Sequence, residues 1–313
     1  MHPHPNVGPG QKGLKSEAMK VALDQALSGR LDDLRGLLAH HGNMPSPNPN
    51  LELAAAFGVE VAAQTRDVTA LLTTLAATNS EAETADVFVP IAAAYGWVAL
   101  ARSSPDNQGA WNAVHEFLAD ERTPVRMGIR DALVRHCGYP FQADRLMVQA
   151  LRWMDEDGEE PQFGVAAVFT EIFAKKTIIT KLADPSLLRE FLSRVVAAVA
   201  DAPRSASRWD SYRRLLAALP SGIAACVASA GSASVLAQAV HAWLKNECTN
   251  AREESVRGLL SEAIIQLRSP AHGLAAGQVD ALHAVLAAGT KPTRRTERMR
   301  PGQGRGKLSR QTK

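Results

Sequence analysis

The chain has 313 residues, of which 46% are hydrophobic, 21% charged and 5% aromatic, and its formal net charge is +3. This apolar fraction is enough to form a sizeable core, so it excludes a chain that is disordered throughout. The three cysteines, Cys137, Cys226 and Cys248, lie far apart, which excludes a disulfide-stapled scaffold and predicts a reducing, cytoplasmic location.

The N-terminal residues 1–13 contain no apolar run. They therefore lack the hydrophobic segment of a secretory signal, and we expect a disordered tail. From about residue 14 to residue 290, apolar residues recur at three and four positions and no segment alternates with a period of two, a pattern typical of successive α-helices. Caps such as Thr123-Pro124 and Asp184-Pro185 mark helix starts. We expect helices to begin near residues 16, 30, 50, 68, 84, 108, 124, 141, 162, 185, 207, 221, 232, 252 and 277.

Helix starts taken near residues 50, 86, 124, 162, 207 and 252 lie roughly 36 to 45 residues apart. That interval is the length of one helical hairpin. A period of about 40 residues built from two helices is typical of an α-solenoid, in which each hairpin buries its apolar face against its neighbours.

The segment from Ala110 to Leu133 carries a more specific pattern. An apolar helix ends at Asp120, a short turn leads to Val125-Arg126, and Ala132-Leu133 follow along the second helix. This segment resembles a HEAT repeat, and the segment 235–267, where Ser255-Val256-Arg257 opens the second helix, resembles another. The resemblance implies an all-α fold, a right-handed α-solenoid of about six HEAT-like hairpins over residues 14–290. It implies almost nothing about function.

Four arginines lie in the turn and the second helix of the first of these segments: Arg122, Arg126, Arg130 and Arg135. Arg126 and Arg130 are four residues apart and share a helix face, so their guanidinium groups are candidates for clamping a phosphate or a carboxylate. The alternative for Arg126 is a structural contact with Asp120 or with a neighbouring hairpin, as the resemblance to HEAT repeats implies.

A second cluster lies at the helix start near residue 207 and consists of Arg208, Trp209, Tyr212 and Arg213. A partly exposed Trp beside Tyr and Arg is the composition of a binding hot spot. It is also suited to stacking on a base or a cation. The alternative is that Trp209 anchors the packing of its hairpin.

Residues 215–244 carry no formal charge, but Pro220, Gly222 and Gly231 interrupt them. No block of about 20 apolar residues remains, so we expect two buried helices and no membrane span.

The C-terminal residues 291–313 contain nine Lys or Arg and one Glu, a charge of +8, whereas the other 290 residues carry −5. We expect a disordered basic tail that attracts polyanions such as nucleic acid weakly, through counterion release. Its candidate polyanion-binding residues are Arg294, Arg295, Arg298, Arg300, Arg305, Lys307, Arg310 and Lys313.

The sequence contains no complete enzyme or metal-binding motif of the kinds considered. His115-Glu116 begins like a zinc-protease helix but lacks the second histidine, and the acidic run 155–160 lacks the Gly and the bidentate Glu of a calcium loop. We expect no catalytic residues, no metal and no cofactor, which favours a non-catalytic protein.

The sequence therefore predicts an interaction or scaffold protein that holds a protein or peptide partner on the concave face of the solenoid. Its expected partner-binding residues are Arg126, Arg130, Arg208, Trp209, Tyr212 and Arg213. The alternative is a nucleic-acid-binding solenoid resembling the HEAT-like alkylpurine DNA glycosylases, in which Trp209-Asp210 would lie near the damaged base. The charge of −5 outside the tail argues against a DNA cradle. A third alternative is a HEAT-like lyase that matures a chromophore or cofactor.

Overall fold

The computed structural model describes residues 9–104, 106–137, 142–155, 163–229, 235–268 and 276–288. Within these ranges the chain is all-helical and contains no strand, which confirms the predicted class. The longer helices are α1 (Pro9–Ala26), α2 (Leu31–His41), α3 (Leu51–Ala62), α4 (Thr69–Ala76), α5 (Phe88–Ser103), α6 (Gln108–Leu118), α7 (Thr123–His136), α8 (Gln142–Asp155), α9 (Phe163–Phe173), α11 (Pro185–Asp201), α12 (Asp210–Ser229), α13 (Val235–Asn250), α14 (Glu254–Leu267) and α15 (Ala276–Ala288). Three short helical segments connect them: η1 (Ala85–Val87), α10 (Lys176–Ile179) and η2 (Arg204–Arg208).

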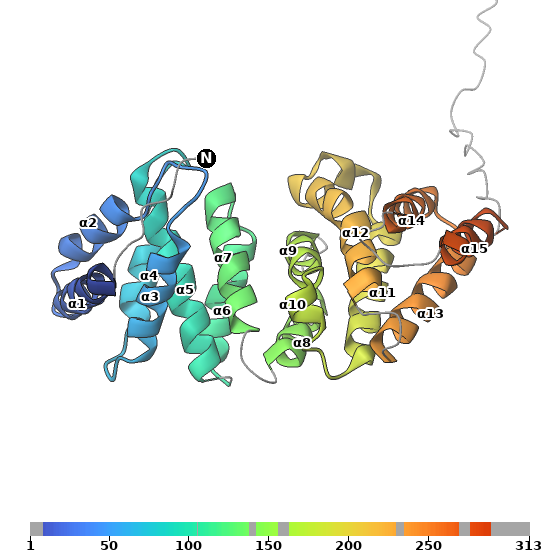
Figure 1. Ribbon diagram of the computed structural model, residues 1–313. Helices are drawn as coiled ribbons and strands as arrows, with labels where there is room; N and C mark the ends of the chain where they lie inside the picture. The colour runs from blue at the N-terminus through green and yellow to red at the C-terminus, as the bar shows by residue number, and fades with distance from the viewer. Residues whose placement is uncertain are drawn as a thin grey trace, which may run out of the picture.

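The helices pack against their neighbours in chain order (Figure 1). One row consists of α3, α5, α7, α9, α12 and α14, each packed on the next. Helices α4 and α6 lie against α5, and α8, α11, α13 and α15 pack in succession along the same side. The turns that lead into α5, α7, α12 and α14 lie along one edge of the molecule.

Most helix starts fall within a few residues of the positions expected from the sequence. Two helices differ from the boundaries expected from the sequence. Helix α1 begins at Pro9, inside the stretch expected to be a disordered tail, and α12 continues through Pro220 where a new helix was expected. A proline removes one backbone donor and usually ends a helix. Here Leu215, Leu219 and Ile223 are buried on both sides of Pro220, and this shared apolar stripe keeps one helix continuous.

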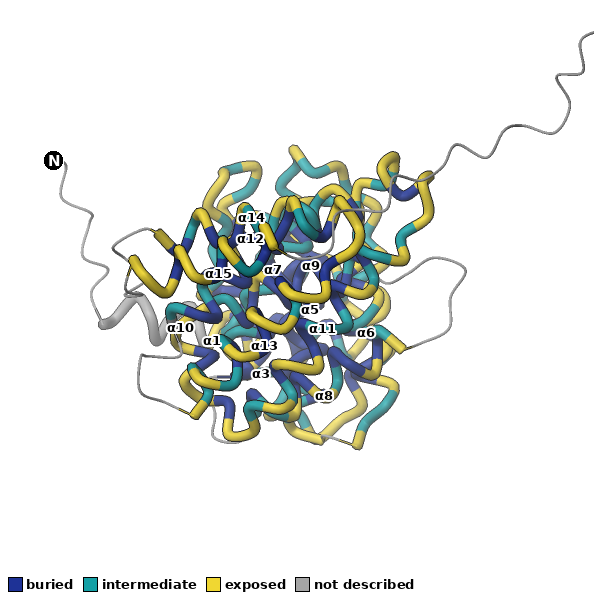
Figure 2. The backbone as a smooth tube through the Cα atoms, turned by 90° about the vertical axis from the view of Figure 1, so that its right-hand side faces the viewer, coloured by how far each residue is buried: buried dark blue, intermediate teal, exposed yellow. Residues whose placement is uncertain are grey.

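Viewed along the row of helices, buried residues occupy the middle and exposed residues the outside (Figure 2). The segment Ala85–Ser103, which includes α5, is long and apolar enough to cross a membrane, but 72% of it is buried inside the fold. Helix α5 packs against α3, α4, α6 and α7 at once. A helix that is covered on all sides is apolar all round, so the composition of α5 fits a central core helix.

Glycines allow close approach at several joints in the first row. A Cβ added at Gly58 of α3 would lie 2.9 Å from the Tyr95 backbone oxygen of α5, and one added at Gly128 of α7 would lie 2.7 Å from a methyl of Ile91. Gly222 of α12 similarly lies against Thr170 of α9. At each of these joints the partner helix occupies the space that a Cβ would need.

The two Val-Arg sites have equivalent contacts. In α7, Arg126 Nη1 donates to the backbone oxygen of Asp120 at 2.6 Å, and in α14, Arg257 Nη1 donates to the backbone oxygen of Ala251 at 3.3 Å. In both places the arginine therefore reaches six residues back and holds the turn before its own helix.

All three cysteines are free and buried. Burial raises the pKa of the Cys137 and Cys226 thiols to about 12 and that of Cys248 to about 11. The basic segment 291–313 and most of the acidic run 155–160 lie outside the described residues.

Candidate functional site

A groove of about 830 Å³ lies where the α6–α7 turn meets the starts of α9 and α12. We call it the seam groove. Its lining residues are His115, Glu116, Ala119, Asp120, Glu121, Arg126, Phe163, Gly164, Val165, Trp209, Asp210, Ser211 and Arg214. It brings together Arg126 and Trp209, two residues that the sequence singled out separately.

The aromatic wall of the seam groove is Trp209, which is half-buried. Its ring lies 6.0 Å from that of Phe163 between centroids, and Phe163 in turn meets Tyr212 edge-on at 4.9 Å. Tyr212 is only 8% exposed and does not line the groove, and its burial raises the pKa of its hydroxyl. Tyr212 therefore supports the wall from behind, which corrects its expected role as a contact residue.

Arg126 is held by the turn on which it stands. Its guanidinium donates to the backbone oxygens of Asp120 and Glu121, both at 2.6 Å, and to the Thr123 hydroxyl at 2.9 Å. Burial, and next the positive charge of Arg214, lower the pKa of Arg126. Arg126 is thus a structural clamp that also places a fixed positive charge on the groove wall.

Arg214 supplies the second positive charge of the groove. Its Nε lies 3.0 Å from Asp210 Oδ2 in an ion pair one turn along α12. Arg213 also lies near Asp210, at 3.5 Å, but it points outside the groove lining and is mostly exposed. The two adjacent arginines therefore share one carboxylate partner but differ in access to the groove.

Carboxylates form the opposite wall. Asp120 is engaged by Arg122, whose Nη2 lies 2.7 Å away and whose Nη1 also reaches the Thr78 backbone oxygen at 3.1 Å. Within the described residues no hydrogen bond or ion pair engages the carboxylates of Glu116 and Glu121, and both residues are exposed. The seam groove thus combines an aromatic wall, two guanidiniums and free carboxylates.

A rigid aromatic cluster supports the floor. The His115 ring stacks on that of Trp153 of α8 at 5.1 Å, and Trp111 and Phe169 each lie 5.9 Å from Trp153. Trp153 is fully buried. These rings join α6, α8 and α9 beneath the groove and fix the spacing of its walls.

The other expected contact residues do not reach the groove. Arg130 forms an ion pair with Glu171 of α9, which ties α7 to α9. Arg208 is exposed and lies in η2 beside the groove lining, and the basic tail lies outside the described residues.

Sequence reasoning missed Phe163, Arg214 and the pair Glu116 and Glu121 as members of one site. Arg214 is adjacent to Arg213 in the sequence. Only the helical spacing of these arginines from Trp209 and Asp210 indicates which of the two side chains points toward the groove. In the part of the chain that the structure places, no group of three His, Cys, Asp or Glu side chains is positioned to hold a metal ion.

Comparisons with protein-family models, with curated proteins and with solved structures give no match for this chain.

Proposed function

We propose that this chain is a non-catalytic interaction protein, a right-handed α-solenoid of HEAT-like hairpins that binds an extended segment of a partner protein in the seam groove. The observation that carries the proposal is the composition of that groove, in which an aromatic wall, fixed guanidiniums and free carboxylates line about 830 Å³. The groove replaces the concave face as the expected site.

Two features support the solenoid. Successive helices of one row pack from α3 to α14 in chain order, as stacked repeats do. In addition, Arg126 and Arg257 make the same contact to a carbonyl six residues earlier, which supports two copies of one repeat.

The groove suits a peptide because its polar groups have opposite signs. Trp209 offers a broad, half-buried anchor surface, a residue type that dominates binding energy at protein interfaces. Arg126 and Arg214 are placed to receive a carboxylate or a backbone carbonyl of the partner, while Glu116 and Glu121 are placed to receive a Lys or Arg side chain. The volume lies within the range of ligand-binding clefts in proteins.

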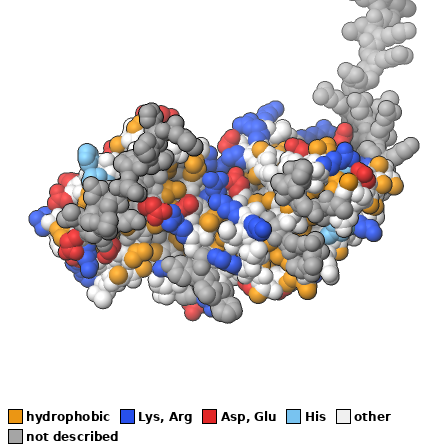
Figure 3. All heavy atoms as spheres, viewed as in Figure 1, with side chains coloured by type: hydrophobic (Ala, Val, Ile, Leu, Met, Phe, Trp, Pro, Cys, Tyr) orange, Lys and Arg blue, Asp and Glu red, His pale blue; other side chains and the backbone are white. Residues whose placement is uncertain are grey.

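Binding of nucleic acid remains the second candidate function, and one observation favours it. Lys and Arg side chains gather over the middle of the face in Figure 3, around α7 and α10. The rest of that face mixes acidic, basic and apolar side chains, and a duplex cradle should be basic along its length.

The test is selection of peptides from a random displayed library against the full chain, followed by affinity measurement with the selected peptides. We expect Trp209→Ala to weaken binding about 30-fold, as for a hot-spot residue. Arg214→Ala should weaken binding about tenfold, whereas Arg213→Ala, which removes the same charge next to the same Asp210, should change it less than about twofold.

A salt series with labelled duplex and single-stranded DNA completes the test. Equal losses for Arg213→Ala and Arg214→Ala would contradict peptide binding in the seam groove. Tight DNA binding that depends on Arg126 and Arg214 would establish the nucleic-acid function instead.

A further inference from the structure

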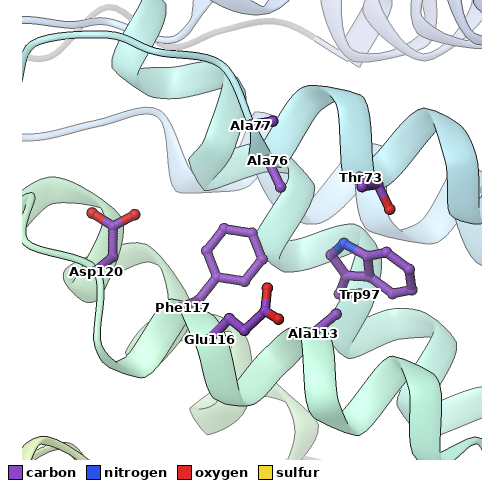
Figure 4. A pocket seen from close by; sticks show the side chains of 8 residues that line it. All are labelled: Thr73, Ala76, Ala77, Trp97, Ala113, Glu116, Phe117 and Asp120. Carbon is purple, nitrogen blue, oxygen red and sulfur yellow. The ribbon is translucent and has the colours of Figure 1, made fainter.

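A second, smaller pocket opens on the other side of the last turn of α6. It has about 250 Å³ and is lined by Thr73, Ala76, Ala77, Trp97, Ala113, Glu116, Phe117 and Asp120. We call it the Trp97 pocket. Figure 4 shows the rings of Trp97 and Phe117 with the Glu116 carboxylate beside them and Asp120 one turn further along.

Two aromatic rings and three alanines give the Trp97 pocket a mainly apolar lining. Trp97 and Phe117 are each 6% exposed and form its aromatic surface, while the alanines of α4 and α6 leave the space above it open. Aromatic faces bordered by a carboxylate attract a cation whose stem is apolar, which describes a lysine or arginine side chain.

Acidic residues surround this pocket. Arg122 joins the α6–α7 turn to the α4–α5 connection through the Thr78 backbone oxygen at 3.1 Å and the Ser80 hydroxyl at 3.3 Å. These two turns carry two guanidiniums, Arg122 and Arg126, and six carboxylates: Glu81, Glu83, Asp86, Glu116, Asp120 and Glu121. Five of the six carboxylates are exposed, and for those five the described residues provide no ion pair or hydrogen bond.

The same chain carries a segment of complementary charge. Residues 291–313 bear +8, against −4 on the two turns. After Ala288 there are 25 residues, which span up to about 80 Å when extended. Helices α15, α13, α11, α8 and α6 follow one another side by side, so at 8–10 Å per helix pair the pocket lies about 40 Å from α15.

We propose that the C-terminal segment 291–313 binds within its own chain along these acidic turns, with an arginine or lysine side chain in the Trp97 pocket. Attachment to the same chain gives the segment a high effective concentration at the pocket, which favours it over a separate basic peptide. Glu116 and Asp120 line both the Trp97 pocket and the seam groove. Occupancy by the segment therefore competes with a partner at the seam groove, although the contact itself does not depend on the proposed function.

The experiment is zero-length carbodiimide cross-linking of the dilute full chain, followed by mass spectrometry of the monomeric product. We expect Lys307 and Lys313 to form amide bonds with Glu81, Glu83, Glu116 or Glu121, each bond forming with loss of one water. The yield should fall about fivefold between roughly 50 mM and 500 mM salt, because exposed charges are screened.

A variant and a matched control locate the contact. Ala77→Arg fills the pocket from an exposed position directly after α4 and leaves every carboxylate in place. This variant should lower the yield about fivefold. Ala18→Arg, at an exposed position on α1, adds the same charge elsewhere and should leave the yield unchanged.

Three results would overturn the proposal: cross-links of Lys307 and Lys313 mainly to carboxylates of other elements, cross-links confined to covalent dimers, or equal yields for Ala77→Arg and the original chain. Circular dichroism of both variants establishes that the helices are retained.

Discussion

The joints along the first row of helices are built in two different ways. At the α3–α5 joint Gly58 lies against the Tyr95 backbone oxygen, and at the α9–α12 joint Gly222 lies against the Thr170 methyl, so neither position has room for a Cβ. At the central α7–α9 joint, side chains span the space instead: Arg130 pairs with Glu171, and the cluster around Trp153 joins α6, α8 and α9. The seam groove opens at this central joint. A smaller pocket of about 230 Å³, lined by Gly58 and Tyr95, opens over the α3–α5 joint. Both kinds of joint therefore leave space at the surface, but the larger groove lies where side chains set the spacing.

The largest effect should come from Trp153→Ala. Trp153 is fully buried and contacts rings from α6 and α9, so its truncation should lower the free energy of unfolding by about 4 kcal/mol. Half-buried Trp209→Ala should cost about 1 kcal/mol. Urea denaturation of both variants measures the difference, and equal losses would contradict the view that Trp153 holds the central joint while Trp209 faces a ligand.

His136 should make the central region sensitive to acid. Its ring meets Trp111 edge-on at 5.7 Å, and burial, with the charges of Arg102 and Arg145, lowers the pKa of His136 from 6.5 to about 4. In the unfolded chain the His136 ring therefore binds a proton more tightly than it does in the folded chain. The stability that depends on neutral His136 is fully present above pH 6.5 and is lost as the pH falls towards 4, by about 3 kcal/mol in total.

The pH dependence is tested with His136→Leu. The difference in unfolding free energy between pH 7 and pH 4.5 should shrink by about 2 kcal/mol in this variant. The exposed His40→Leu serves as the control. An unchanged pH profile for His136→Leu would show that carboxylates alone account for the acid sensitivity.

At the glycine joint, Gly58→Ala should lower the free energy of unfolding by about 2 kcal/mol, because the new methyl lies 2.9 Å from a backbone oxygen that cannot rotate away. Gly258 of α14 has nothing within 4 Å of its added Cβ. Gly258→Ala should therefore raise stability by about 0.5 to 1 kcal/mol through helix propensity alone. Thermal denaturation measures both variants. A lower melting temperature for Gly58→Ala and a higher one for Gly258→Ala would confirm close packing at the α3–α5 joint, and shifts in the same direction would contradict it.

The smallest effect should come from the ion pair across the central joint. Arg130 and Glu171 have side chains 33% and 43% exposed, and solvent screens such pairs strongly. A double-mutant cycle with Arg130→Ala and Glu171→Ala should give a coupling of about 0.5 kcal/mol. A coupling above about 2 kcal/mol would mean that this pair, more than the aromatic cluster, sets the central joint.

The helices were predictable because apolar periodicity and caps such as Thr123-Pro124 act within a few residues of one another. Pro220 was misleading because a proline's local cost is visible in the sequence, whereas the burial of Leu215 and Ile223 that offsets it is a tertiary effect.

The site was only half visible in the sequence. Local composition singled out Arg126 and Trp209 separately. They line one groove only because of how the four helices between them in the sequence, α8 to α11, pack together. Phe163 looked like an ordinary core residue, since a single sequence cannot show which neighbour an aromatic ring supports.

The three buried thiols make local opening of the fold measurable by chemical labelling. Cys137 directly follows α7, Cys226 lies in α12 and Cys248 in α13. Since each thiol is buried and stays protonated, alkylating reagents can modify it only when its own surroundings open. The relative labelling times of the three cysteines therefore rank how readily these regions open in the unaltered chain, without any introduced probe.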